Sequence, residues 1–246
     1  PGKKYNTIKY KGLNLAVMIC EDMWFNSLPL HLKKNGANIF ICINASPYEE
    51  GKLNKRIEIA RKLVKKTKIP LLYLNQIGGQ DELVFDGNSF LMNIEGDLLE
   101  KCHAWKEDLK EINTSNLLIK KLFVNNDLER SYEYNTWSAL ALGLRDYFLK
   151  NSFNKIVLGL SGGIDSAVSA AIAVDAIGCK NVIGILMPSK YSSKGSLNDA
   201  KKSAELLKIK TNIFKIEDIH KTFYKSLSKN FIKKVKNIKD ENLQSR

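Results

Sequence analysis

Residues 156–166 read Ile-Val-Leu-Gly-Leu-Ser-Gly-Gly-Ile-Asp-Ser, an apolar run that leads into a glycine-rich turn. A short apolar run that ends at glycines is typical of a buried strand. Downstream the pattern continues, and it predicts strands at 156–160, 182–187 and 212–216 and helices at 166–177, 197–207 and 219–231. Strands that alternate with crossover helices form a parallel, Rossmann-like sheet.

The glycine-rich turn has the composition of a phosphate-binding loop. Gly162 and Gly163 allow a sharp turn and a close approach of the backbone to an anion. Backbone N–H groups and the N-terminus of the following helix attract negative charge, and the hydroxyls of Ser161 and Ser166 can donate to phosphate. Asp165 would repel phosphate unless a magnesium ion lies between them. The alternative is a simple turn in which Asp165 and Ser166 cap the helix.

The residues before this sheet also alternate strands and helices. The pattern predicts strands at 13–20, 39–44 and 70–75, helices at 29–35 and 52–67, and a hairpin of 89–94 with 98–101 turned by Glu95-Gly96-Asp97. Residues 106–132 are polar and lack periodicity, which indicates a linker, whereas 134–150 carries an amphipathic helical stripe. The chain is therefore expected to be an α/β protein with two layered parts.

Composition excludes several classes of protein. Of 246 residues, 44% are hydrophobic and 26% charged, as in a globular chain rather than a disordered one. The net charge of +13 comes from scattered lysines with only five arginines, which favours solvated faces over a nucleic-acid surface; the alternative is a surface that attracts anionic substrates. No apolar run approaches the roughly 20 residues that span a bilayer. Four cysteines without a CxxC pair fit a reducing cytoplasm.

Cys20 is the candidate nucleophile of the first part. It ends an apolar run and is followed by Glu21 and Asp22, which suit a turn out of a strand. A nucleophilic cysteine needs such an accessible strand end, whereas a cysteine among apolar residues more often belongs to a core. The local sequence leaves both interpretations open for Cys20, and for the other three cysteines it favours the core.

Several motifs carry a resemblance to known families. The Ser-Gly-Gly-x-Asp-Ser pattern at 161–166 resembles the loop of the ATP pyrophosphatase superfamily, and 19–24 (Ile-Cys-Glu-Asp-Met-Trp) resembles the nucleophile segment of nitrilase-type amidases. Residues 44–56 and 73–87 resemble the glutaminase domain of glutamine-dependent NAD synthetases, and 137–147, 187–193 and 241–244 resemble that family's second domain. Asn88 stands where the family usually has a second glycine, a mild departure because asparagine tolerates a left-handed backbone.

The resemblance implies a fold and a domain organisation. The fold is the C-terminal part of a nitrilase-like α-β-β-α sandwich, followed by the first half of a Rossmann-like, adenine nucleotide alpha hydrolase-like ATP pyrophosphatase domain. Residues 1–108 would be the partial glutaminase domain, 109–132 the linker and 133–246 the partial ATP-binding domain. We expect the chain to be an internal fragment with little glutaminase activity alone, because the family's glutamate base and lysine precede the cysteine and residues 1–19 contain no glutamate.

The resemblance also implies an activity: ATP adenylates deamido-NAD, and ammonia from glutamine displaces AMP to give NAD. Cys20 would attack glutamine, Ser46 and Lys52 would hold it, and Asn242 and Arg246 would approach deamido-NAD. The ATP site would consist of Gly159, Leu160, Ser161, Gly162, Gly163, Ile164, Asp165 and Ser166, with Asp165 facing Mg²⁺ and residues 187–189 near the adenosine. Without the family match, Ser46 could cap a strand end, Lys52 could be a solvated helix start, Pro188 could make a turn, and 242–246 could be a solvated helix.

Two alternatives stay open. One is another amidotransferase of the same superfamily, similar to GMP synthetase. The other is a noncatalytic chain, either an ATP-binding remnant or a subunit that builds an oligomer or binds nucleic acid; the intact loop argues against the latter. The family resemblance further implies a cytoplasmic homo-oligomer that acts on small molecules, without nucleic-acid or membrane partners.

Overall fold

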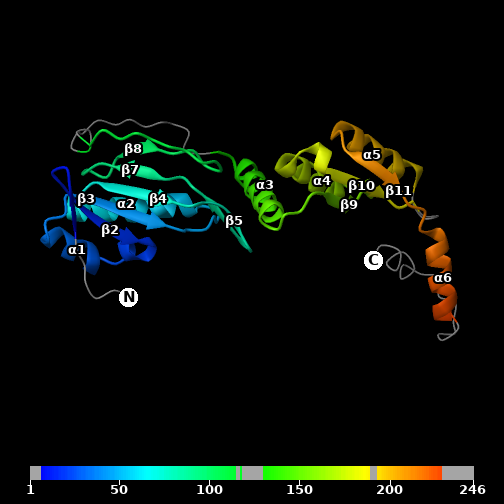
Figure 1. Cartoon of the computed structure of the whole chain (residues 1–246), viewed down its shortest axis with the longest axis horizontal. Coiled ribbons are helices and arrows are strands. Elements are labelled where there is room, and N and C mark those ends of the chain that lie inside the picture. The colour runs from blue at the N-terminus through cyan, green and yellow to red at the C-terminus, as the bar shows by residue number, and fades with distance from the viewer. Residues whose placement is uncertain (1–6, 115–116, 118–129, 189–192, 229–246) are drawn as a thin grey trace. The chain divides into compact units, whose positions relative to one another are not determined.

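The computed structural model describes residues 7–114, 117, 130–188 and 193–228. The contacts divide the chain into two compact units, Pro1–Tyr147 and Phe148–Arg246. The division falls inside one helix, α3 (Tyr132–Lys150). Each unit is described by itself below, and both appear in Figure 1.

The first unit is built on a mixed sheet of six strands in the order β1-β2-β3-β4-β7-β8. Its strands are β1 (Ile8–Tyr10), β2 (Leu13–Ile19), β3 (Ile39–Asn44), β4 (Leu71–Asn75), β7 (Phe90–Met92) and β8 (Leu98–Lys101). The central three strands are parallel, with Leu15 paired to Ile39 and Phe40 to Leu71. The outer pairs are antiparallel. The carboxyl ends of β2, β3 and β4 therefore meet at one edge of the sheet.

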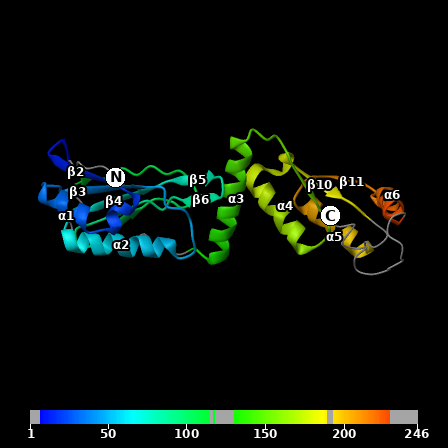
Figure 2. The same ribbon diagram turned by 90° about the horizontal axis from the view of Figure 1, so that it is seen from below.

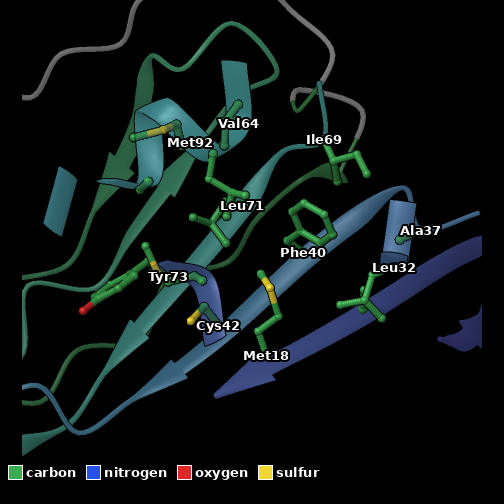
Figure 3. Close-up of a cluster of buried hydrophobic side chains, with 14 of the residues drawn as sticks. Met18, Leu32, Ala37, Phe40, Cys42, Val64, Ile69, Leu71, Tyr73 and Met92 are labelled. Carbon is green, nitrogen blue, oxygen red and sulfur yellow. The ribbon is translucent and has the colours of Figure 1, made fainter. Parts of the chain in front are cut away.

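Two helices cover one face of this sheet. They are α1 (Ser27–Lys34) and α2 (Lys52–Thr67), and Figure 2 shows α2 running along that face. The helical periodicity of α2 points Ile57, Ala60 and Val64 inward, and all three are buried. They pack on alternate residues of the strands, which Figure 3 shows for Met18, Phe40, Cys42, Leu71, Tyr73 and Met92. At the carboxyl edge of the sheet, this core forms the floor of the candidate site.

The opposite face of the sheet is covered by the segment that follows β8. Ile39, Leu91 and Leu99 form a second apolar cluster there with Leu117. Ile112 packs against the same cluster. Part of the segment that the sequence identifies as a linker thus contributes to a hydrophobic core. The sequence hides this contribution because the apolar residues of the segment follow no helical or strand periodicity among its charged and polar ones.

A small hairpin, β5 (Ile77–Gln80) with β6 (Leu83–Asp86), was not predicted. The sequence of β5 contains two adjacent glycines, which weaken the strand pattern. These glycines lie against α3: a Cβ on Gly79 would be 3.1 Å from the Cα of Gly143. The Gly79 N–H also donates to Asp146 Oδ2 at 2.7 Å. The missing side chains therefore allow the hairpin and the helix backbones to approach closely.

The second unit contains a parallel three-stranded sheet in the order β11-β10-β9. Its strands are β9 (Ile156–Gly159), β10 (Val182–Leu186) and β11 (Lys210–Ile213), and its helices are α4 (Ile164–Ile177), α5 (Lys194–Leu206) and α6 (Glu217–Ser228). A short 3-10 turn, η3 (Cys179–Asn181), leads into β10. The predicted βαβ alternation is confirmed, with most boundaries within two residues. Helix α6 is described only to Ser228, so 229–231 lie outside the described residues.

Candidate active site

Cys20 lies directly after β2, where it opens the 3-10 helix η1 (Cys20–Trp24). Its φ of +49° is in the left-handed region, which is uncommon for a residue with a side chain. The turn is held by Asp22, whose Oδ2 accepts the N–H of Ile19 at 2.9 Å. The side chain of Cys20 is partly exposed. A strained, accessible cysteine at a strand end has the placement expected of a nucleophile.

Glu21 adjoins Cys20 in the turn that follows β2, as its polar character suggests. Strand alternation would place its side chain opposite that of Cys20, but the strand ends at Ile19 and the chain turns into η1. Alternation therefore does not apply to Glu21, which is exposed. Nothing in the contacts of Glu21 assigns it a catalytic role.

Cys42 lies on β3, in contact with the backbone of Cys20, and belongs to the core, as its sequence predicts. Its Sγ donates weakly to the backbone oxygen of Cys20 at 3.7 Å and to Asn44 Oδ1 at 3.4 Å. Burial raises the pKa of the Cys42 thiol from 9.0 to about 12. A thiol that stays protonated is a poor nucleophile. Of the two neighbouring cysteines, Cys20 is therefore the one placed to react.

Ser46 and Lys52, the predicted glutamine ligands, flank the loop between β3 and α2. Ser46 is 7% exposed, and its N–H donates to Asn75 Oδ1 at 2.9 Å. Lys52 is the first residue of α2, and its Nζ pairs with Glu49 Oε2 at 2.8 Å. Glu49 is largely exposed, so this ion pair is weak and leaves Lys52 able to bind another anion.

Tyr73 lies behind Ser46 on β4. Its ring stacks on Phe90 with centroids 4.6 Å apart and an interplanar angle of 4°. Burial raises the pKa of Tyr73 to about 12, although the positive charge of Arg56 and a side-chain hydrogen bond with Ser46 act in the opposite direction. The phenol is consequently a neutral hydroxyl that adjoins Ser46 under ordinary conditions.

Arg56 and Asp86 form a buried ion pair that sequence reasoning did not predict. Their side chains are 2% and 3% exposed, and Arg56 Nη1 lies 2.9 Å from Asp86 Oδ1. Asn88 has the left-handed backbone that its position requires, with φ of +56°, and its Nδ2 donates to Asp86 Oδ2 at 2.6 Å. One signal was available: Arg56 is one of five arginines and falls on the apolar stripe of α2 beside Ile57 and Ala60.

A cavity of about 340 Å³ opens beside the start of α2. Residues 48–51, 101–105 and the ends of β6 and the linker line it, including Asp86 and Arg130. Cys20, Ser46 and Lys52 do not line this cavity. Gly51 and Leu53, on either side of Lys52 in the sequence, do line it.

The phosphate loop follows β9 in the second unit. Leu160 is buried and its N–H donates to Ile185 O at 2.8 Å, so it contributes backbone rather than side chain. Gly162 has φ of +86°, and a Cβ there would collide with the backbone carbonyl of Ser196. Only glycine satisfies both constraints. The turn therefore places the start of α4 directly after the end of β9.

The two serines of the loop are hydrogen-bonded to each other and to its backbone. Ser161 Oγ lies 3.1 Å from Ser166 Oγ and accepts the Gly163 N–H at 3.2 Å. Ser166 Oγ donates to Gly163 O at 3.0 Å. Ile164 begins α4, and the N–H groups of its first turn have no carbonyl partner within the helix. Exposed Asp165 lies in that turn. This arrangement can hold an anion on backbone N–H groups and hydroxyls.

The remaining predicted ligands are only partly covered. Met187 lies just after β10 and is 49% exposed, so it is free to contact a nucleotide. Ser189, Asn242 and Arg246 lie outside the described residues. Over the part of the chain that the structure describes, no helix is long and apolar enough to cross a membrane.

Comparison with known families gives a match for each part of the chain. A family model described as carbon–nitrogen hydrolase matches residues 1–117, and one described as NAD synthase matches residues 136–246. Glutamine-dependent NAD(+) synthetases of Acinetobacter baylyi and Synechocystis are 36% and 39% identical over 100% and 96% of this chain. The chain spans about half the length of the curated relatives it matches, 46% and 45%.

Solved structures give the same result. The glutamine-dependent NAD+ synthetase of Acinetobacter baumannii, solved in complex with ADP, has a TM-score of 0.90 and 35% identity over 99% of this chain and 46% of its own. A synthetase from Cytophaga hutchinsonii, with a TM-score of 0.78 and 17% identity over 98% of this chain and 45% of its own, shares the fold. The chain thus joins a part that matches the carbon–nitrogen hydrolase family to a part that matches the NAD synthase family. It belongs to the family of glutamine-dependent NAD synthetases.

Proposed function

We propose that the protein containing this chain amidates deamido-NAD to NAD, with ammonia released from glutamine and with ATP cleaved to AMP and pyrophosphate. The observation that carries the proposal is the presence of two sites in one chain: an accessible cysteine in a strained turn after β2, and a glycine-hinged loop before α4. Neither site alone selects this reaction. Membership of the family supplies the acceptor, deamido-NAD.

The first site would release the ammonia. Cys20 Sγ attacks the side-chain amide carbon of glutamine, a thioester forms, and ammonia leaves; water then releases glutamate. Ser46 and Lys52 hold the substrate by a hydroxyl and a cation. The residues that act as base and that stabilise the oxyanion in nitrilase-type amidases are not assigned, because residues 1–19 contain no glutamate.

The second site would activate the acceptor. A carboxylate is a poor acceptor for ammonia, and transfer of AMP to its oxygen creates a good leaving group. Residues 159–166 would bind the ATP phosphates through backbone N–H groups and the hydroxyls of Ser161 and Ser166. The positive end of α4 would stabilise the charge that develops on the departing pyrophosphate.

Magnesium fits this site as an ion shared with phosphate. The described residues include no group of three or more His, Cys, Asp or Glu side chains that could enclose a metal. Mg²⁺ bound together with phosphates needs only one or two carboxylates, and Asp165 supplies one at the first turn of α4. When bound, the ion would neutralise phosphate charge.

The test separates the two sites in the product of the complete coding region. Wild-type protein should form NAD and AMP from deamido-NAD and ATP with either glutamine or ammonium chloride as nitrogen donor. Cys20→Ala should reduce the glutamine-dependent rate about a hundredfold or more and leave the ammonia-dependent rate within about twofold. Loss of both rates in a folded variant, or AMP formation that requires xanthosine monophosphate instead, would reject the proposal.

A homo-oligomeric assembly and a cytoplasmic location stay predictions from the family. Light scattering on the purified product tests the first. Fractionation of the source cells tests the second.

A further inference from the structure

Arg56 connects the helix α2 to two separate segments of the first unit. Its guanidinium reaches Asp86 at the end of β6 and the loop after β3 that contains Ser46 and Pro47. The side chain is 2% exposed. A long, charged side chain that is buried to this degree must find a partner for every donor.

Each of the five donors of Arg56 has an acceptor. Nη1 donates to Asp86 Oδ1 at 2.9 Å and to Oδ2 at 3.0 Å. Nη2 donates to the backbone oxygens of Ser46 and Pro47, both at 2.8 Å. Nε donates to Ser46 Oγ at 3.0 Å. Three of the five bonds therefore end on the loop that carries a predicted substrate ligand.

Asn75 fixes the same loop from the other side. Its Oδ1 accepts the N–H of Ser46 at 2.9 Å, and its Nδ2 donates to Ser46 O at 3.2 Å. The backbone of Ser46 is thus held by Arg56 and Asn75 together. Apolar side chains of similar volume often stabilise a protein as well as a buried ion pair does. Stability of the loop alone therefore does not explain why an ion pair holds it.

The bond from Arg56 to the Ser46 side chain has a direction. A guanidinium has no acceptor and keeps its charge, so Ser46 Oγ must accept from Nε. The hydroxyl proton of Ser46 must then point away from Arg56. The Ser46 side chain interacts with Tyr73 and lowers the pKa of its phenol. Tyr73 and a substrate oxygen are therefore the two acceptors to which the Ser46 hydroxyl can donate.

We infer that Arg56 is a positioning residue that presents the Ser46 hydroxyl as a hydrogen-bond donor to an oxygen atom of glutamine. Asp86 holds the guanidinium in place for this task. The inference rests on the proposed glutaminase function and specifies it, because Ser46 selects an acceptor oxygen, not an N–H group, of the substrate. Arg56 itself touches no reacting atom.

The test is a mutant cycle read by glutamine binding. The parent is the product of the complete coding region with Cys20→Ala, which prevents turnover, and the dissociation constant for L-glutamine is measured by titration calorimetry. Ser46→Ala and Arg56→Lys are made singly and together. Arg61→Lys is the matched control, because Arg61 lies on the same helix and its Nε donates to Gly96 O at 3.0 Å, away from Ser46.

Each single variant should raise the dissociation constant about tenfold, and the double variant should raise it about as much as Ser46→Ala alone. The shared effect is expected because Arg56 acts through Ser46. A purely structural role would give additive losses, about a hundredfold in the double variant. Additive losses, or an unchanged constant in Ser46→Ala, overturn the inference. Arg61→Lys should leave the constant within about twofold.

Two controls keep the outcomes separate. Circular dichroism melting reports whether each variant folds, and if Arg56→Lys does not, the charge-free pair Arg56→Gln with Asp86→Asn replaces it in the cycle. Failure of the parent to bind glutamine would reject the proposed function itself. Binding by the parent with additive losses would reject only the positioning role.

Discussion

At the scale of single residues, Arg56 and Asp86 are a costly pair. Removing both charges from water costs several kcal/mol per ion, and their mutual attraction offsets this only when every donor and lone pair is satisfied. The structure meets that condition through Ser46, Pro47 and Asn88. The consequence is that either partner alone becomes a liability in the folded state.

Arg56→Leu in this chain should therefore lower the free energy of unfolding by about 3–5 kcal/mol, because it leaves Asp86 buried without a counter-ion. Urea unfolding followed by circular dichroism measures the change. Arg61→Leu is the matched control, and it should cost roughly 1 kcal/mol because it removes one hydrogen bond at a partly exposed site. Equal losses for the two variants would contradict the buried-pair account.

The raised pKa of Cys42 predicts that the free energy of unfolding falls at alkaline pH. Its folded pKa is raised to about 12, above its ordinary value of 9.0, so the folded state favours the neutral thiol. This contribution is complete below pH 9 and is lost as pH rises through about 12. Tyr73 adds a loss of the same sign from about its ordinary value of 10.0 upward.

The free energy of unfolding should consequently fall between pH 9 and pH 12, and Cys42→Ala should flatten that fall. Denaturant titrations at half-unit pH steps measure both slopes. An identical slope in wild type and Cys42→Ala would show that the thiol is not the titrating group.

At the scale of elements, the start of α4 depends on one glycine. Gly162 combines a left-handed φ of +86° with a contact that leaves no room for a Cβ beside Ser196. Gly178, at the other end of the same helix, has φ of +80° but nothing within 4 Å of an added Cβ. Both positions therefore have a positive φ that would strain any residue with a side chain. They differ in the space left for a Cβ and in their distance from the phosphate loop.

Gly162→Ala should weaken ATP binding about tenfold or more, because the loop must move away from its anion-binding geometry. Gly178→Ala should introduce a similar backbone strain, because its φ is also positive, and it should keep the ATP affinity within about twofold. Titration calorimetry with ATP and magnesium measures both. Equal affinities in the two variants would show that the loop does not hold the phosphates.

The hairpin β5–β6 depends on a second close approach, to α3. Asp146→Ala should speed hydrogen exchange of the Gly79 amide about tenfold, because the carboxylate that accepts this N–H at 2.7 Å is removed. Arg145→Ala is the control, since Arg145 contacts only the other oxygen, Asp146 Oδ1. Exchange that is unchanged in Asp146→Ala would contradict the docking of the hairpin on α3.

Sequence periodicity predicted the long elements and several short strands, but it missed the short strands β1, β5 and β6. Helix α2 and strand β3 were predicted at their observed bounds, because sixteen residues with one apolar face, and five apolar residues followed by Asn44, leave little ambiguity. Strands β1 and β5 were missed: one has three exposed residues and the other two glycines. Strand β1 is too short for its alternation to stand out, and β5 has no alternation of apolar and polar side chains.

The sequence likewise predicts some of the candidate site residues and misses others. The phosphate loop and Cys20 are local features, so adjacent residues in the sequence specify them. The pair of Arg56 with Asp86 joins residues thirty positions apart through tertiary packing, which local periodicity does not encode. The roles of Asn242 and Arg246 stay predictions.

At the scale of the whole molecule, the proposed function assigns two successive reactions to one chain. The first unit carries the residues proposed to release ammonia, and the second carries those proposed to activate the acceptor. Ammonia is useful to the second reaction only if it arrives before it escapes, so a single polypeptide for both parts raises its effective concentration. We therefore expect nitrogen from glutamine to enter the product.

The most direct measurement follows that nitrogen. The product of the complete coding region is incubated with deamido-NAD, ATP, magnesium and glutamine labelled with ¹⁵N in its side-chain amide, and NAD and AMP are quantified by mass spectrometry. The account predicts ¹⁵N in the amide of NAD, with one AMP formed per NAD. Unlabelled or absent NAD, or AMP formed without deamido-NAD, would contradict it.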